Sequence, residues 1–211
     1  MANYTAADVK ALRDRSGAGM MDCKGALDEA DGNVDKALEF LRLKGLKGVT
    51  KREGRTTSNG LIVARVSGGT GTLIELACET DFVAKNADFV AFAQAIADKA
   101  VETGVSSIDE LTAQELNGAK IADLIIDQTG KIGEKIGVSK FETISADKVV
   151  AYIHGNYRLA VLVGFNQDVD GLDEAGKDVA MQIAAMSPVG VDKADVDVSN
   201  VREIFVMNIA Q

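Results

Sequence analysis

The chain has 211 residues, 46% of them apolar and 26% charged, which is typical of a folded globular protein and argues against disorder. A net charge of −9 makes it a poor general binder of nucleic-acid phosphates and favours protein partners. Its longest apolar runs are far too short to span a membrane, and the N-terminus lacks the pattern of a secretory signal. The two cysteines, Cys23 and Cys78, imply no disulfide framework, so we expect a cytoplasmic protein.

Three short helices are predicted for residues 1–45. Thr5 and Asp8 have the spacing of a capping box, and apolar residues then recur at helical spacing in three separate stretches. Helices of this length would form a small three-helix bundle. Met20 and Met21 follow the glycine-rich turn 17–19, where they would lie either in the bundle core or on an adaptable contact surface.

A basic linker is predicted at residues 46–59. From Arg42 to Arg55 the sequence has six basic side chains interleaved with glycines, and Glu53 is the only acid among them. Two interpretations remain open. The segment is either a basic strip that contacts an acidic surface of a partner or a solvated hinge.

The remaining sequence predicts two copies of a strand–turn–strand–helix unit, at 60–145 and 146–211. Val63-Ala64 in the first copy matches Val150-Ala151 in the second, and the rest follows without a gap. The predicted strands are 60–66, 72–79, 136–143, 148–154 and 158–165, and the predicted helices include 108–128, 172–186 and the apolar segment 201–211. The expected fold class is therefore α+β, with a helix layered on an antiparallel sheet in each copy.

No catalytic, metal or nucleotide site is predicted. A Cys78–His154 pair could be written as a nucleophile and base, but Cys78 falls within the apolar alternation of a strand and fits a core residue better. A calcium-like run begins at Asn166 but has Lys177 where a bidentate Glu is needed. The glycine patterns match no phosphate-binding loop. We therefore expect a protein that is not an enzyme and holds no cofactor.

The nonapeptide Cys78–Asn86 is unusual because it places apolar residues between a strand and a helix, where a short polar connection would suffice. Phe82 and Val83 would either fold back to plug the core or project as an anchor for a partner. The residues alone leave both alternatives open.

Three motifs together resemble the elongation factor Ts family: Gly17–Lys24, the nonapeptide Cys78–Asn86, and Tyr152–Gly155. The resemblance extends over about residues 1–200 and implies that the N-terminal three-helix bundle is UBA-like. It implies a guanine-nucleotide exchange factor that binds the elongation factor Tu–GDP complex, promotes GDP release by displacing magnesium, and lets GTP rebind during translation elongation. The partner contacts it implies are a magnesium-dislocation loop of Thr80, Asp81, Phe82 and Val83, together with Arg13, Met20, Met21 and His154.

Other functions and assemblies remain open at this point. The main alternative is a helical interaction module without exchange activity, followed by a Cys78–His154 hydrolase. Family members commonly continue into a coiled coil and a C-terminal module, and we expect both to be truncated or absent here. The assemblies considered are a homodimer, which would cover the apolar segment 201–211, and a heterotetramer.

Overall fold

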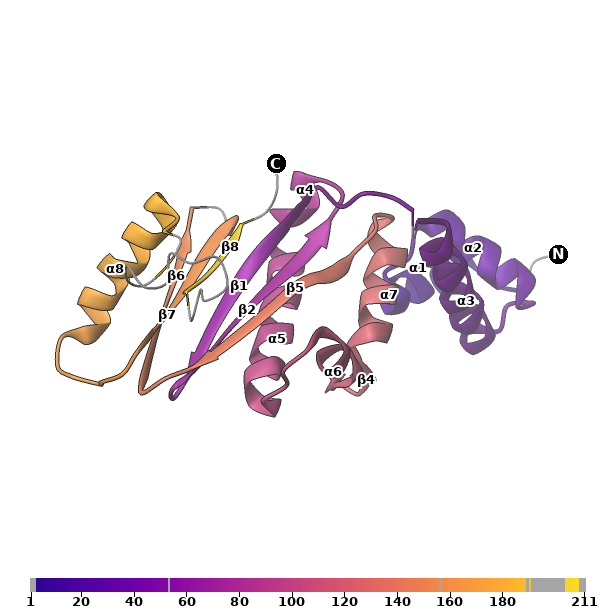
Figure 1. The fold of residues 1–211 in the computed structure, drawn as a ribbon. Coiled ribbons are helices and arrows are strands. Elements are labelled where there is room, and N and C mark those ends of the chain that lie inside the picture. Colours follow the sequence, from indigo (N-terminus) through magenta and orange to yellow (C-terminus); the bar gives the residue numbers. More distant parts are fainter. Residues whose placement is uncertain (1–2, 53, 156, 189, 191–203, 209–211) are drawn as a thin grey trace. The chain divides into compact units, whose positions relative to one another are not determined.

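The computed structural model describes residues 3–52, 54–155, 157–188, 190 and 204–208 (Figure 1). The chain folds into two compact units. Residues Met1–Thr56 and Ala122–Ile136 make up the first, and Thr57–Ile121 with Gly137–Gln211 make up the second. None of the described helices is both long enough and apolar enough to cross a membrane. The domain boundaries predicted from the sequence group the chain differently and remain a prediction.

The first unit contains the three predicted N-terminal helices. These are α1 (Ala6–Ser16), α2 (Met20–Glu29) and α3 (Val34–Arg52), and most of α7 (Ile121–Ile132) also belongs to this unit. Helix α3 continues to Arg52, through much of the predicted linker. Its leucine, lysine and arginine residues are good helix formers, so the glycines there do not end the helix.

Local contacts explain where the first helix begins and ends. The Thr5 hydroxyl accepts a hydrogen bond from the Asp8 N–H at 3.3 Å, and the Asp8 carboxylate accepts one from the Thr5 N–H at 2.7 Å. This is the predicted capping box. Gly17, with φ of 66°, ends the helix in a left-handed conformation that favours glycine. The bundle core consists mainly of Val9, Leu12, Cys23, Ala26, Leu27, Ala30 and Ala37.

The second unit contains two antiparallel three-stranded sheets, each covered by a helix (Figure 1). The first sheet has the order β1-β2-β5, with strands Asn59–Ser67, Thr70–Cys78 and Gly137–Ser145, and helix α5 (Ala87–Thr103) packs on β1 and β2. The second has the order β6-β7-β8, with strands Lys148–His154, Leu159–Phe165 and Ile204–Asn208, and helix α8 (Leu172–Met186) packs on β6 and β7. The predicted duplication and the α+β class are confirmed.

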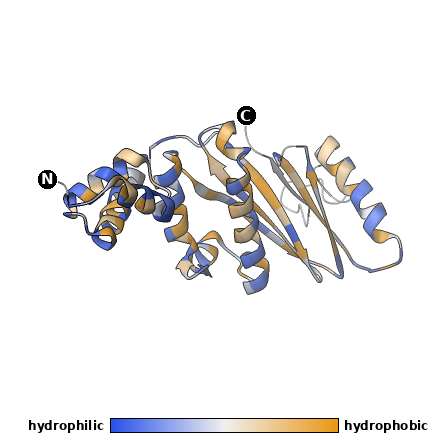
Figure 2. Ribbon diagram, turned by 180° about the vertical axis from the view of Figure 1, so that it is seen from behind, coloured by the Kyte–Doolittle hydropathy of each residue, from blue (hydrophilic) through white to orange (hydrophobic). Residues whose placement is uncertain are grey.

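The two sheets pack face to face, and successive residues of a strand point alternately toward the other sheet and toward the covering helix. Ile62 of β1 and Leu73 of β2 meet Leu162 of β7 in a buried cluster between the sheets. Val161, next to Leu162, points the opposite way and packs toward Ile183 of α8. Figure 2 shows strands of the first sheet largely in the colour of apolar residues. Two-sided burial explains why these strands are apolar on both faces.

Two predicted helices differ from the structure. Residues 108–128 form α6 (Ile108–Ala113), a hairpin of β3 (Glu115–Leu116) and β4 (Ala119–Lys120), and the start of α7. The hairpin turns at Asn117-Gly118, both with positive φ, which is a strong hairpin signal that interrupts the helix. Within 201–211, residues Ile204–Asn208 form strand β8 against β7, so the helix prediction was wrong there. Residues 201–203 and 209–211 lie outside the described part.

Candidate functional site

The nonapeptide Cys78–Asn86 forms a short helical turn between β2 and α5. Helix α4 (Asp81–Ala84) is capped at its N-terminus by Thr80, whose hydroxyl accepts a hydrogen bond from the Val83 N–H at 3.5 Å. The Lys85 N–H donates to the Asp81 carbonyl at 3.1 Å and closes the turn. The next residue, Asn86, caps α5 by accepting from the Asp88 N–H at 2.8 Å. Two consecutive caps therefore fix the path of this connection.

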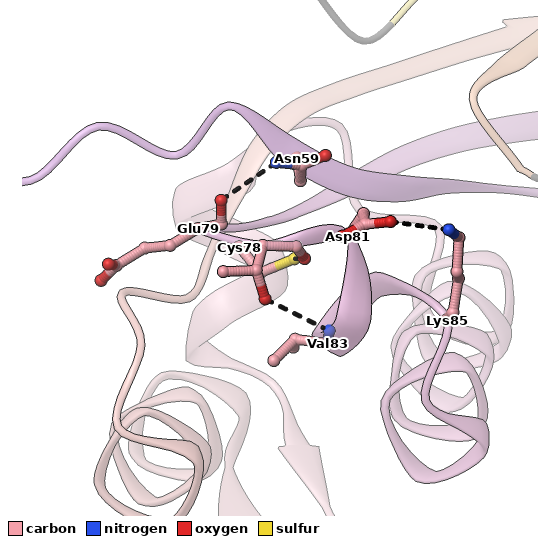
Figure 3. Close-up of polar contacts among 7 residues, drawn as sticks. Asn59, Cys78, Glu79, Asp81, Val83 and Lys85 are labelled. Atoms are coloured by element: carbon pink, nitrogen blue, oxygen red, sulfur yellow. Dashed lines mark hydrogen bonds and ion pairs between the residues drawn. The ribbon is translucent and has the colours of Figure 1, made fainter.

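Contacts from the strands also hold the start of this turn (Figure 3). The Asn59 side-chain amide, at the start of β1, donates to the Glu79 carbonyl at 3.0 Å. The Cys78 thiol, at the end of β2, donates to the Thr80 carbonyl at 3.2 Å. The turn is thus attached to the sheet on one side and to α5 on the other, which preorganises the residues it presents.

The helical turn has an inner and an outer face. Val83 and Ala84 are half-buried, and α4 packs against β1 and β2. Phe82 is 83% exposed. The core-plug alternative is therefore wrong for Phe82, whereas Val83 is partly inside. The Phe82 ring is exposed to solvent on a turn that hydrogen bonds hold in place, so it is available for contact with a partner.

The charges of the turn lie beside this ring. The Lys85 ammonium donates to the Asp81 carboxylate at 2.6 Å, and both side chains are partly exposed. The hydrogen bond from Lys85 lowers the pKa of Asp81 below its ordinary value. Asp81 is therefore ionised at neutral pH. The predicted site does not include Asn59 or Lys85. For Lys85 the sequence does contain a signal, because a spacing of four residues from Asp81 is typical of an ion pair on a helix.

The other predicted contact residues are all on the surface. Arg13 is exposed in the last turn of α1. Met20 and Met21 begin α2 and are 55% and 76% exposed, so the alternative that they lie in the bundle core is wrong. His154 ends β6, is exposed, and has its Nδ1 2.8 Å from the Tyr152 hydroxyl. The first three residues belong to one unit, and His154 belongs with the nonapeptide to the other.

Strand β6 ends at His154, and Tyr157 in the turn that follows contacts the first sheet. The Ile62 N–H of β1 donates to the Tyr157 carbonyl in this turn at 2.7 Å. Ile62 is three residues from Asn59, which contacts the connection before α4. His154 and the nonapeptide therefore lie toward the same end of the two-sheet unit.

Cys78 is a core residue. It is fully buried, pairs with Asn59 across the β1–β2 ladder, and directs its thiol to a backbone carbonyl. This environment gives a substrate no access to the thiol, and His154 is hydrogen-bonded to Tyr152. Across the described residues, no group of three or more His, Cys, Asp or Glu side chains could hold a metal ion.

We expect the Cys78→Ala variant to lose about 1 kcal/mol or more of folding free energy, because a packed side chain is shortened. Any partner-dependent activity of the folded fraction should persist. Chemical denaturation and an activity assay on the same preparation check both parts. Complete loss of activity at unchanged stability would instead support a nucleophilic role.

Comparisons with known proteins identify relatives of this chain. The family model described as Elongation factor TS matches residues 79–210. Elongation factor Ts of Paenarthrobacter aurescens (strain TC1) is 46% identical over 201 residues, which are 93% of this chain and 72% of that protein. Elongation factor Ts of Arthrobacter sp. (strain FB24) is 48% identical over 201 residues, which are again 93% of this chain and 72% of that protein. Elongation factor Ts of Kocuria rhizophila is 47% identical over 204 residues, covering 95% and 74% of the two chains.

The family model covers more than half of this chain, and the relatives match nearly all of it across both units. The chain belongs to the elongation factor Ts family.

Proposed function

We propose that this protein is a guanine-nucleotide exchange factor that binds the elongation factor Tu–GDP complex, promotes GDP release by displacing magnesium, and so allows GTP to bind. Membership of a family of translation elongation factors supports the general role. The observation that supports the mechanism is the exposure of Phe82, which is 83% exposed on a turn held by hydrogen bonds. Both cysteines are free thiols, in keeping with the cytoplasm as the place of action.

The proposed mechanism needs no covalent chemistry. A GTPase of this class holds GDP through backbone amides, a lysine and a magnesium ion. A protein that binds the nucleotide-free state more tightly weakens nucleotide binding by the same factor, because the two equilibria are linked. Burying one Phe side chain contributes about 1.5–3 kcal/mol, which corresponds to roughly 10- to 150-fold in affinity.

A wider docking surface would supply the rest of the binding energy. We assign it to Arg13, Met20 and Met21 of the helical unit and to His154 of the two-sheet unit, all of which are exposed. The exposed methionines suit this role because flexible thioether side chains adapt to apolar surfaces. In this proposal, Thr80–Val83 enters beside the magnesium site while the other residues anchor the complex.

Calorimetry with two forms of elongation factor Tu tests the function. The protein should bind the nucleotide-free form at least tenfold more tightly than the form loaded with GDP and magnesium. Equal affinity for the two forms would contradict exchange and would identify a plain interaction module.

The isolated protein is expected to bind neither GDP nor GTP, because its glycine-containing turns lack the spacing of a phosphate-binding loop. Titration of each nucleotide into the protein alone, with and without magnesium, should produce no binding heat. Micromolar binding to the isolated chain would contradict the proposal that the partner holds the nucleotide.

A further inference from the structure

The outer face of α4 and its C-terminal cap together carry three side chains and not one. Asp81 and Lys85 are four residues apart and meet across the turn at 2.6 Å, while Phe82 projects next to Asp81. The Asp81 and Lys85 side chains are 45% and 63% exposed. A surface that covers Phe82 would therefore also cover, at least in part, the ion pair beside it.

The ion pair contributes little to folding. Exposed pairs at this spacing are weak because water screens them. The turn is also held without the side chain of Lys85, by the Thr80 cap, by the Lys85 backbone N–H and by the Asn59 hydrogen bond to Glu79. The side chain of Lys85 is therefore not needed for the shape of this connection. Any larger contribution of this side chain would have to come from the binding of a partner.

Docking changes the environment of the pair. When a partner covers Phe82, water is removed from the adjacent carboxylate, and an unpaired charge is costly to transfer out of water. The attraction between two charges also grows as the surrounding dielectric constant falls. A carboxylate that arrives already paired with an ammonium avoids much of this cost, so the pair should matter more in the complex than in the free protein.

We propose that Lys85 is a positioning residue for nucleotide exchange, which holds the Asp81 carboxylate in place beside Phe82 while the turn enters the partner. The inference rests on the proposed exchange function. It predicts that Lys85 acts through Asp81 and needs no contact of its own with the partner. The positive charge, more than the shape of the lysine, carries the role.

Stimulated GDP release from elongation factor Tu tests this role in the full chain. Lys85→Met should reduce the apparent second-order rate constant about tenfold or more, with the melting temperature unchanged within about 2 °C. Lys85→Arg should retain most of the activity because it restores the charge. Lys177→Met, which removes an exposed lysine from α8, controls for the change in net charge.

A double-mutant cycle tests whether Lys85 works through Asp81. In the Asp81→Asn background, adding Lys85→Met should change the rate by no more than about twofold. A full tenfold further loss would overturn the proposal, since Lys85 would then act on the partner independently. If Lys85→Met is fully active while Phe82→Ala is slow, the proposed role of Lys85 is overturned and the exchange mechanism stands. Full activity of Phe82→Ala as well would overturn the exchange mechanism and this inference together.

Discussion

Replacing Phe82 with alanine is expected to slow stimulated GDP release by an order of magnitude or more, while the free energy of unfolding stays within about 0.5 kcal/mol of wild type. The reason is that Phe82 is 83% exposed, so its loss opens no cavity in the protein's own core. An aromatic anchor at the centre of an interface, by contrast, commonly contributes more than about 2 kcal/mol to binding. Thermal melting and stopped-flow release of fluorescent GDP measure the two quantities on one preparation.

A matched control is available on α8. Met186 is 75% exposed and lies outside the proposed contact residues, so Met186→Ala also removes a large exposed apolar side chain. It should leave both stability and GDP release near wild type. A Phe82→Ala protein that melts much earlier, yet exchanges nucleotide normally in its folded fraction, would contradict the role of Phe82 as an anchor.

Truncating Leu162 to alanine is expected to lower the free energy of unfolding by about 2–5 kcal/mol, the range for a buried leucine that leaves a cavity. Leu162 is fully buried between the two sheets, with Ile62 and Leu73 opposite it. Urea denaturation measures the change. Val66→Ala, at a position 39% exposed in β1, is the control and should cost much less. A loss below about 1 kcal/mol at Leu162 would contradict the close packing of the sheets.

The repeated unit could be predicted from sequence because its signals are local. Val63-Ala64 and Val150-Ala151 occupy matching strands, β1 and β6, and apolar alternation identifies each strand without knowledge of its neighbours. The face-to-face packing of the sheets could not be predicted in this way. It depends on which side of each strand meets the other sheet, and strands that are apolar on both faces do not encode that choice.

The two wrong helix assignments have different causes. Asn117-Gly118 was a readable hairpin signal that the apolar periodicity of the flanking residues concealed. Strand β8 has a run of β-branched and aromatic residues that fits either a buried helix or a strand. Its pairing with β7 decides the outcome, and such tertiary pairing is not visible in a short segment.

At the candidate site, too, one part could be predicted from the sequence and another part only the structure shows. The sequence motif located the segment containing Phe82, but a plug and an anchor have identical sequences. The structure separates them because Val83 and Ala84 occupy the inner side of the turn, which leaves Phe82 outside. Asn59 could not have been found from the motif, since it reaches the Glu79 carbonyl from a different strand.

The most direct test of the account is the rate of release of fluorescent GDP from elongation factor Tu as the concentration of this protein is raised, at fixed magnesium and with excess unlabelled GDP. We predict that the rate rises with concentration toward a plateau well above the spontaneous rate. The Phe82→Ala variant should require a higher concentration, reach a lower plateau, or both. A rate that stays at the spontaneous value, with binding of the two proteins demonstrated under the same conditions, would contradict the exchange function.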